Sequence, residues 1–163
     1  MTILKILLGD PRHNTVGTHS SYVPINIGYI GAFLKKKIQS VEIDLKLSTD
    51  PEEILKFIDQ WKPDIIGISN YVWNSSLSNR ISEYSKKLNP NILSILGGPE
   101  FPAGTGARNI ENTSQDKTYD KCLDYLKKRP SVDYFAYCDG EVVFFEIVNK
   151  FIENNHSLKL MKE

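Results

Sequence analysis

The sequence predicts an α/β fold in which five parallel strands form a doubly wound sheet in the order 2-1-3-4-5. Short β-branched runs alternate with amphipathic segments five times along the chain, and parallel neighbours need such crossover helices. Residues 64–69 are almost unbroken in their apolar character, as in a strand covered on both faces. Residues 41–47 alternate apolar and charged side chains, which is typical of an edge strand. An outer second strand and a central third strand favour this Rossmann-like, flavodoxin-like order.

Length and charge limit the classes of function. The 163 residues are enough for one domain, and the 20 basic and 20 acidic side chains give no net charge. This balance argues against nucleic acid or an acidic membrane surface as partner and favours a small ligand. The sequence contains no apolar run of the roughly 20 residues that a membrane helix needs, and Cys122 and Cys138 stand too far apart for a CxxC pair. We expect a cytoplasmic protein with two incidental cysteines.

Turn and capping residues divide the chain into its elements. Gly9, Asp10 and Pro11 end the first strand, Asp50 and Pro51 open the second helix, and two glycines end the fourth strand. The expected strands are residues 3–8, 41–47, 64–69, 92–96 and 132–137. The expected helices are residues 24–37, a helix opened by residues 48–53 and running to 61, then 75–88, 117–129 and 141–151.

Two segments carry more specific expectations. The helix at residues 75–88 has apolar side chains at positions 77, 81, 84 and 88, so we expect these to form its buried side. Residues 103–116 are rich in Gly, Asn, Thr and Ser without any period, which indicates a long exposed loop. Loops of that length in compact domains are usually functional or disordered.

The predicted strand order brings four loops to one edge of the sheet. They are residues 9–23, 70–74, 97–108 and 138–141, which follow the first, third, fourth and fifth strands. In open α/β sheets the ligand binds at this carboxyl edge, where the strand order reverses. We therefore expect the binding site there.

The chemistry of these loops leaves alternatives open. Tyr71 and Trp73 form either a flat apolar wall at the edge or core aromatics of the following helix. Ser69 either satisfies a polar atom of a ligand or bonds its own backbone. Gly97 and Gly98 either let the backbone pass close to a bulky group or form a tight turn.

The remaining loop residues give weaker indications. Asp139, Gly140 and Glu141 are consistent with a simple helix cap. The first loop contains His13 and His19 but neither G-x-G-x-x-G nor G-x-x-x-x-G-K-S/T, so a dinucleotide or triphosphate site is not expected. The two histidines lack Cys or carboxylate partners at zinc spacing, and we expect no metal site.

Four motifs follow one another along the chain. They are Tyr22-x-Pro24-x-x-x-Gly28-Tyr29-Ile30-x-Ala32-x-Leu34, then Pro63-Asp64-Ile65-Ile66-Gly67-Ile68-Ser69-x-Tyr71-Val72-Trp73-Asn74, Gly97-Gly98-Pro99-Glu100, and Val132-Asp133-Tyr134 leading to Gly140-Glu141. As an ordered set they resemble the cobalamin-binding domain that precedes the radical SAM domain in cobalamin-dependent radical SAM proteins. The likeness covers nearly the whole chain apart from residues 103–118.

The resemblance implies where the cofactor lies. The corrin ring would lie across the carboxyl ends of the strands, near the first loop and residues 71–74, with the nucleotide tail beside Ser69, Gly97 and Gly98. The implied cofactor-binding residues are Asp10, Pro11, Tyr22, Pro24, Ser69, Tyr71, Val72, Trp73, Asn74, Gly97, Gly98, Pro99, Glu100, Gly140 and Glu141.

The sequence departs from related families at two points. Cobalamin domains of the mutase type carry Asp-x-His-x-x-Gly after the first strand, whereas here His13 stands one position later and the glycine is missing. A cobalt-ligating histidine is therefore not expected, as in many radical SAM relatives. The radical SAM domain binds a 4Fe-4S cluster through Cys-x-x-x-Cys-x-x-Cys, which two isolated cysteines do not supply. No catalytic residue is assigned to this chain.

The resemblance thus implies a carrier domain. Residues 1–163 would be a single cobalamin-binding domain, the N-terminal part of a larger protein or a natural short relative. A radical SAM domain in cis or in trans would bind S-adenosylmethionine and the cluster, for methyl transfer to a substrate. The alternative is a flavodoxin-like binding or regulatory module with another ligand or none, since Thr15, Thr18, Ser20 and Ser21 offer hydroxyls for a flavin phosphate.

Overall fold

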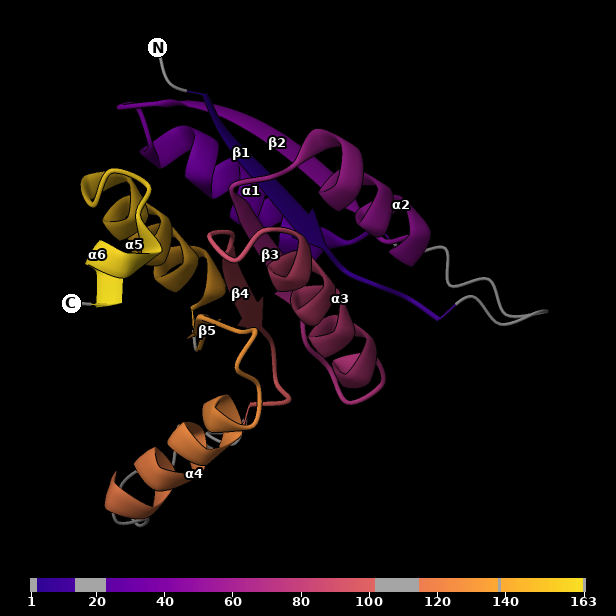
Figure 1. Ribbon diagram of the computed structural model, residues 1–163, viewed down its shortest axis with the longest axis vertical. Helices are drawn as coiled ribbons and strands as arrows, with labels where there is room; N and C mark the ends of the chain where they lie inside the picture. The colour runs from indigo at the N-terminus through magenta and orange to yellow at the C-terminus, as the bar shows by residue number, and fades with distance from the viewer. Residues whose placement is uncertain (1–2, 14–22, 102–114, 138, 163) are drawn as a thin grey trace.

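Five parallel strands form the sheet of the computed structural model, which describes residues 3–13, 23–101, 115–137 and 139–162 (Figure 1). The strand order is β2-β1-β3-β4-β5, and every neighbouring pair is parallel. This confirms the predicted fold and order. The strands are β1 (Ile3–Gly9), β2 (Glu42–Ser48), β3 (Ile65–Ser69), β4 (Leu93–Gly97) and β5 (Tyr134–Ala136).

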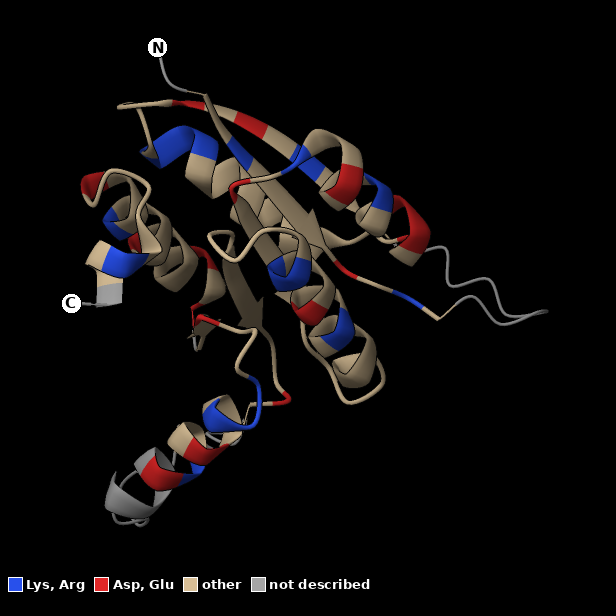
Figure 2. Cartoon of the chain, in the orientation of Figure 1, with Lys and Arg blue, Asp and Glu red and all other residues tan. Residues whose placement is uncertain are grey.

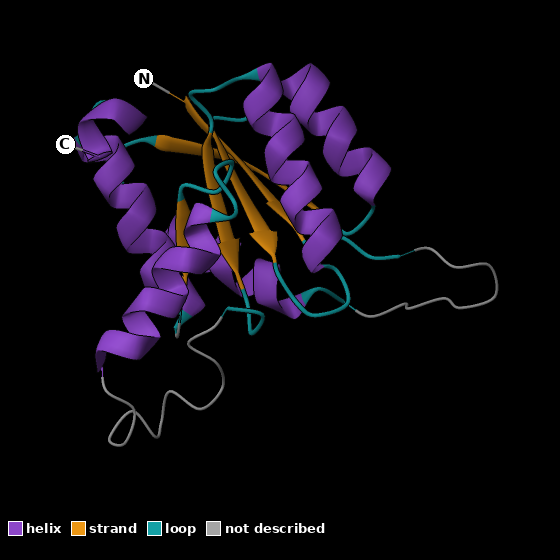
Figure 3. Ribbon diagram, turned by 60° about the horizontal axis from the view of Figure 1, so that its bottom comes forward, coloured by secondary structure: helices purple, strands orange, loops and turns teal. Residues whose placement is uncertain are grey.

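Helices cover both faces of this sheet (Figure 3). α1, α5 and α6 pack on one face, and α2, η1 and α3 pack on the other. Right-handed crossovers place their helices on opposite faces on the two sides of the point where the strand order reverses, which produces this three-layer arrangement. The helices are α1 (Ile25–Lys37), α2 (Pro51–Lys56), η1 (Phe57–Trp61), α3 (Ser75–Leu88), α4 (Gln115–Lys127), α5 (Gly140–Glu153) and α6 (Leu158–Lys162).

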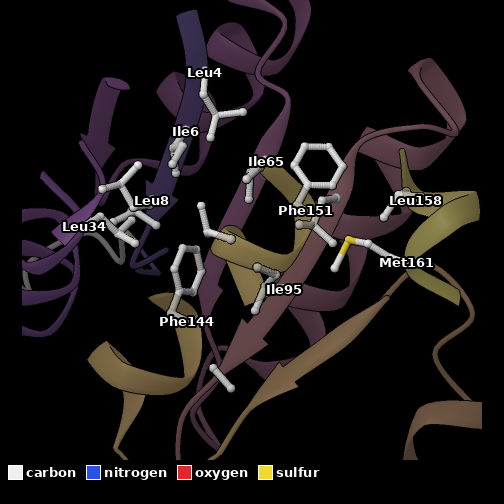
Figure 4. Close-up of a cluster of buried hydrophobic side chains, with 14 of the residues drawn as sticks. Leu4, Ile6, Leu8, Leu34, Ile65, Ile95, Phe144, Phe151, Leu158 and Met161 are labelled. Atoms are coloured by element: carbon white, nitrogen blue, oxygen red, sulfur yellow. The ribbon is translucent and has the colours of Figure 1, made fainter. Parts of the chain in front are cut away.

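Each face of the sheet has its own hydrophobic core. Figure 4 shows the first core, in which Leu4, Ile6 and Leu8 of β1 lie toward Phe144 and Phe151 of α5. The second core packs α2, η1 and α3 against the opposite face of the same strands. The central strand β3 contributes to both cores, and all five of its residues are buried. The prediction of a strand covered on both faces is therefore confirmed.

The edge strand β2 also matches its prediction. It has one neighbour, β1, and its residues are mostly half-buried. Its outer side chains interact with η1, where Asp44 accepts a hydrogen bond of 3.2 Å from the indole nitrogen of Trp61 and Lys46 lies over the same ring. These contacts join η1 to the edge strand.

The buried side of α3 agrees with the prediction at three of its four positions. Ile81 is buried, and Leu77 and Tyr84 pack half-buried against the same core, but Leu88 is exposed. Three serines that were not predicted, Ser78, Ser82 and Ser85, are also buried. Their hydroxyls donate to backbone carbonyls, which satisfies the polar groups without neighbouring polar side chains. Small side chains let the helix backbone approach the sheet closely, and the apolar period alone did not indicate these serines.

The second helix is also less regular than predicted. Asp50 caps it by accepting the amide of Glu52, and Pro51 is the first helical residue, both as expected. The α-helix ends at Lys56, however, and the segment up to Trp61 is a π-helix. Lys62 then takes a left-handed conformation that returns the chain to β3.

Two aspartates of the resemblance motifs fasten strand ends. The Asp64 carboxylate accepts the amide of Lys5 at 2.8 Å, and the Asp133 carboxylate accepts the amide of Ser94 at 2.9 Å. Asp133 also forms an ion pair with Lys86 of α3. Both aspartates precede strands at the edge of the sheet opposite the predicted site, so their role is to fix strand register.

The later elements shift relative to the predictions. β5 is shorter than expected. α4 begins at Gln115, so residues 115 and 116 of the predicted 103–116 loop are helical, and residues 103–114 lie outside the described residues. The short helix α6 was not predicted. In Figures 1 and 3, α4 lies beyond the carboxyl ends of the strands, apart from the other helices.

Charges of both signs share the same helices, as α2, α3 and α4 show in Figure 2. Across the part of the chain that the structure describes, no helix has the length and apolarity required to cross a membrane.

Replacing Gly28 by Ala should stabilise the protein. A Cβ built at this position in α1 meets no described atom within 4 Å, so the change removes backbone entropy without a clash. We expect the free energy of unfolding to rise by about 0.5–1 kcal/mol in urea denaturation. Gly31→Ala is the matched control and should gain less, because its Cβ would lie 2.6 Å from Leu45 Cδ2. A loss of stability in Gly28→Ala would contradict the open space seen at this site.

Candidate functional site

A cavity of about 220 Å³ lies at the carboxyl ends of β1, β3, β4 and β5, between α1 and α5. This is the edge at which the sequence predicted the site. Most of its lining is apolar, with Asn26, Ser69, Tyr71 and Glu141 as its polar side chains. The other lining residues are Leu8, Ile27, Ile30, Gly67, Ile68, Ile95, Leu96, Gly97, Gly98, Ala136, Gly140 and Phe144.

Small residues shape the sheet side of the cavity. A Cβ on Gly67 would lie 2.5 Å from the Phe144 ring, so glycine at this position lets that ring lie directly on β3. A Cβ on Gly97 would lie 3.3 Å from the carbonyl oxygen of Ala136, which is a tight contact with a backbone atom. Gly67 is an isolated glycine inside the apolar strand β3, and such a glycine often marks a close approach of another group to the strand. The sequence therefore indicated Gly67 as a cavity residue, although we did not assign it.

Gly98 forms a tight turn over the end of β3. Its φ angle is +135°, a conformation that residues with a Cβ rarely adopt, and an ideal Cβ would lie 2.5 Å from the carbonyl oxygen of Asn70. The backbone amide of Asn70 donates to the backbone carbonyl of Gly97 at 2.7 Å, and the backbone amide of Glu100 donates to the backbone carbonyl of Asn70 at 3.3 Å. The turn therefore wraps around the backbone of Asn70.

Three buried polar residues, Asp10, Ser69 and Asn74, form what we term the polar clasp. The Ser69 hydroxyl donates to the Asp10 carboxylate at 2.5 Å. The Asn74 amide nitrogen donates to the Ser69 hydroxyl at 3.2 Å and to the carbonyl of Pro11 at 3.1 Å, while its oxygen accepts the amide of Tyr71 at 2.7 Å. The clasp joins the loops after β1 and β3. The alternative in which Ser69 bonds its own backbone is wrong, because its hydroxyl donates to the Asp10 carboxylate. Contact of Ser69 with a ligand stays a prediction.

Tyr71 and Trp73 form an aromatic platform at the edge of the site. Their rings stack with centroids 4.6 Å apart and an interplanar angle of 6°. Trp73 is 61% exposed and Val72 is 77% exposed, so this pair is a wall at the edge rather than part of the helix core. The Tyr71 hydroxyl accepts a hydrogen bond of 3.3 Å from Asn26 of α1.

The first loop reaches this platform through His13. Its Nε2 lies 2.8 Å from the carbonyl oxygen of Trp73, and because a carbonyl only accepts, the imidazole is the donor. The tautomer with hydrogen on Nε2, or the imidazolium, makes this bond. His13 is exposed and connects two of the four predicted loops.

The structure brings together some of the predicted cofactor residues and separates others. Six of them line the cavity: Ser69, Tyr71, Gly97, Gly98, Gly140 and Glu141. Asp10, Pro11 and Asn74 are buried in or beside the polar clasp, and Pro24 is half-buried at the start of α1. Val72, Trp73 and Pro99 are exposed, and Glu100 is half-buried. Tyr22, like His19 and Cys138, lies outside the described residues.

The other residues that line the cavity were not assigned from the sequence. They are Leu8, Asn26, Ile27, Ile30, Gly67, Ile68, Ile95, Leu96, Ala136 and Phe144. Asn26 and Phe144 belong to helices, and no residue pattern distinguishes a helix side chain that borders a cavity from one in the core. Among the described residues, no three His, Cys, Asp or Glu side chains gather in a group suited to a metal ion. The hydrogen bond from Tyr84 to Asp59 raises the pKa of that tyrosine, which is not among the cavity residues.

The doubly wound sheet with a cavity at its carboxyl edge defines a ligand-binding α/β domain. The model of the B12 binding domain matches residues 15–108, which is more than half of the chain. The chain therefore belongs to the B12-binding domain family. This confirms the resemblance to cobalamin-binding domains that the motifs indicated.

The relatives of known name are much longer than the segment they share with this chain. A cobalamin-dependent radical SAM methyltransferase, TokK of Streptomyces tokunonensis, is 30% identical over 87 residues, which is 53% of this chain and 10% of the relative. The 2-(S-pantetheinyl)-carbapenam-3-carboxylate methyltransferase of Streptantibioticus cattleyicolor is 27% identical over 86 residues, again 53% and 10%. An uncharacterized methyltransferase of Pyrococcus horikoshii is 24% identical over 159 residues, 91% of this chain and 30% of the relative.

Solved structures share the fold. A CheY-like response regulator receiver domain of Methanospirillum hungatei aligns with a TM-score of 0.56 at 11% identity, covering 95% of this chain and 98% of that one. A signal receiver domain from Pseudomonas fluorescens aligns with a TM-score of 0.52 at 13% identity, with the same coverage. At these identities the likeness concerns the fold alone.

Proposed function

We propose that this chain binds cobalamin at the carboxyl edge of its sheet, as the carrier domain of a radical SAM methyltransferase. The observation that carries the proposal is the cavity between α1 and α5, which opens at the edge where a member of the B12-binding family is expected to hold its ligand. The nucleotide tail would enter this cavity, and the corrin ring would lie near the aromatic platform and the first loop.

The residues present fit such a ligand. The interior of the cavity is mainly aliphatic and aromatic, which suits a flat heterocyclic base. Asn26 and Glu141 supply polar groups from the first turns of α1 and α5. The exposed platform of Tyr71 and Trp73 offers a flat apolar surface beside the cavity.

The chain's own residues bind, orient and exclude water. When bound, cobalamin supplies a cobalt centre that accepts a methyl group and passes it on. Phe144 and the aliphatic lining shield the cavity from solvent, and the polar clasp fixes the loops that border it. We assign no catalytic residue to this chain. S-adenosylmethionine and a 4Fe-4S cluster would belong to a radical SAM domain in cis or in trans, in keeping with the name of one relative, the radical SAM methyltransferase of Streptomyces tokunonensis.

The match to the B12 binding domain favours cobalamin over the flavin alternative. The hydroxyl groups on which a flavin site would depend, at residues 15, 18, 20 and 21, all lie outside the described residues. We therefore use a flavin only as a competitor in the test. Single-domain organisation over residues 1–163 and a cytoplasmic location stay predictions.

Retention of cobalamin is the direct test. The protein is mixed with hydroxocobalamin in the dark, desalted, and examined by visible spectroscopy. We expect corrin absorbance to elute with the protein in a ratio approaching one per chain. A parallel sample with flavin mononucleotide should elute colourless. An eluate with flavin absorbance and without corrin absorbance would overturn the proposal, and binding of neither ligand would contradict it for this chain.

A further inference from the structure

Asn70 stands between two cavity-lining residues, Ser69 and Tyr71, yet its side chain does not line the cavity. It is 0% exposed, and its amide nitrogen donates a hydrogen bond of 2.8 Å to the hydroxyl of Tyr125 in the last turns of α4. The amide oxygen has no hydrogen-bond partner among the described residues. A buried amide with one partner depends strongly on that partner, because losing it leaves the whole group unsatisfied.

Asn70 also sets the position of the glycine turn. Its backbone holds Gly97 through one hydrogen bond and Glu100 through another, and the absent Cβ of Gly98 lets the turn rest on its carbonyl group. Any shift of Asn70 therefore moves the turn that borders the cavity. Because Tyr125 holds the side chain of Asn70, it acts on Gly97 and Gly98 through that residue.

Tyr125 is itself fixed in place. It is 8% exposed, and the guanidinium of Arg129 lies 3.6 Å from the centre of its ring. The ring of Phe101, at the end of the glycine turn, meets the Tyr125 ring edge-on with centroids 5.3 Å apart. Tyr125 thus contacts both ends of the turn, through Asn70 at one end and Phe101 at the other.

We infer that Tyr125 is a positioning residue for the nucleotide tail of cobalamin, acting through Asn70 and the turn at Gly97 and Gly98. This inference rests on the proposed function. Tyr125 lies outside residues 15–108, the segment that the B12 binding domain model matches. It belongs to α4, the helix that lies beyond the carboxyl ends of the strands in Figure 1, so the position of this helix is linked to the ligand turn.

The test compares two corrinoids that differ in the tail. Cobinamide has the corrin ring of cobalamin and lacks the nucleotide. Tyr125→Phe removes the hydroxyl and leaves the ring in its packing. We expect the variant to bind cobalamin about fivefold more weakly than the wild type, as for the loss of one hydrogen bond, with the affinity for cobinamide unchanged. A general loss of stability would weaken both ligands equally, and that result would overturn the inference.

Tyr84→Phe is the matched control, because it also removes a tyrosine hydroxyl that bonds a side chain, here the Asp59 carboxylate away from the cavity. It should bind both corrinoids as the wild type does. Equal cobalamin affinities of wild type and Tyr125→Phe would overturn the inference while leaving the proposed function intact. A wild type that does not bind cobalamin would remove the proposed function and this inference with it.

A double variant tests, with cobalamin alone, whether Tyr125 acts through Asn70. In Asn70→Leu/Tyr125→Phe both polar groups are replaced by apolar groups of similar shape, which is nearly neutral for a buried pair. If Tyr125 acts through Asn70, the double variant should bind cobalamin within about twofold of the wild type, although each single variant is weaker. Losses that simply add would show two independent effects and would overturn the inference.

Discussion

Gly98→Val should lower the affinity for cobalamin on the order of a hundredfold, which corresponds to about 2.8 kcal/mol of binding free energy. The Cβ of any replacement would lie 2.5 Å from the carbonyl oxygen of Asn70, and the φ angle of +135° is unfavourable for a β-branched residue. The obstacle is backbone and not a flexible side chain, so the turn itself has to move. Titration of the protein with hydroxocobalamin, followed by visible absorbance, measures the effect.

A strained substitution elsewhere separates this effect from lost stability. Asn155 has a φ angle of 54° in the turn after α5 and is not among the residues that line the cavity, so Asn155→Val also places a β-branched side chain at positive φ. We expect it to lower the free energy of unfolding by about 1–3 kcal/mol and to bind cobalamin normally. The far-UV circular dichroism of Gly98→Val should match that of the wild type. Normal cobalamin binding by Gly98→Val would show that the tail does not pass this turn.

The strand order could be predicted because burial leaves a direct mark on sequence. Residues 64–69 are apolar at nearly every position since β3 contributes to both cores, and residues 41–47 alternate since β2 lies at the edge. The buried serines of α3 could not be predicted in the same way. The hydroxyl of a buried serine can donate to a backbone carbonyl of the helix, as Ser82 does to Ser78. A serine in this helix is therefore compatible with either a buried or an exposed position.

The location of the site followed from topology, but its internal bonds did not. Parallel strands place all their carboxyl ends at one edge, so the four loops had to meet there. Which loop residue faces the cavity and which one joins the loops is decided by contacts between distant segments. Asn70 and Tyr125 are 55 positions apart, and Asp10 and Ser69 are 59 apart. A single sequence does not contain these pairings.

Asn74 illustrates the difference between the two kinds of loop residue. The family resemblance implies that it lies near the corrin ring, whereas in the structure it is fully buried and holds three groups: the Tyr71 amide, the Pro11 carbonyl and the Ser69 hydroxyl. Asn74→Ala removes these bonds together and leaves buried backbone groups without partners. We expect the free energy of unfolding to fall by about 3 kcal/mol, measured by urea denaturation of the protein without ligand.

Asn79→Ala is the matched control for this prediction. Its amide donates to Glu83 one turn later on α3, in an exposed interaction, so the change should stay within about 0.5 kcal/mol of the wild type. A role of Asn74 in the polar clasp and a role as a direct ligand contact predict opposite effects of Asn74→Ala on the stability of the protein without ligand. A role in the polar clasp lowers stability before any ligand is added, because the loops after β1 and β3 lose their connection. Unchanged stability combined with weaker cobalamin binding would instead make Asn74 a direct contact of the ligand and would contradict the clasp.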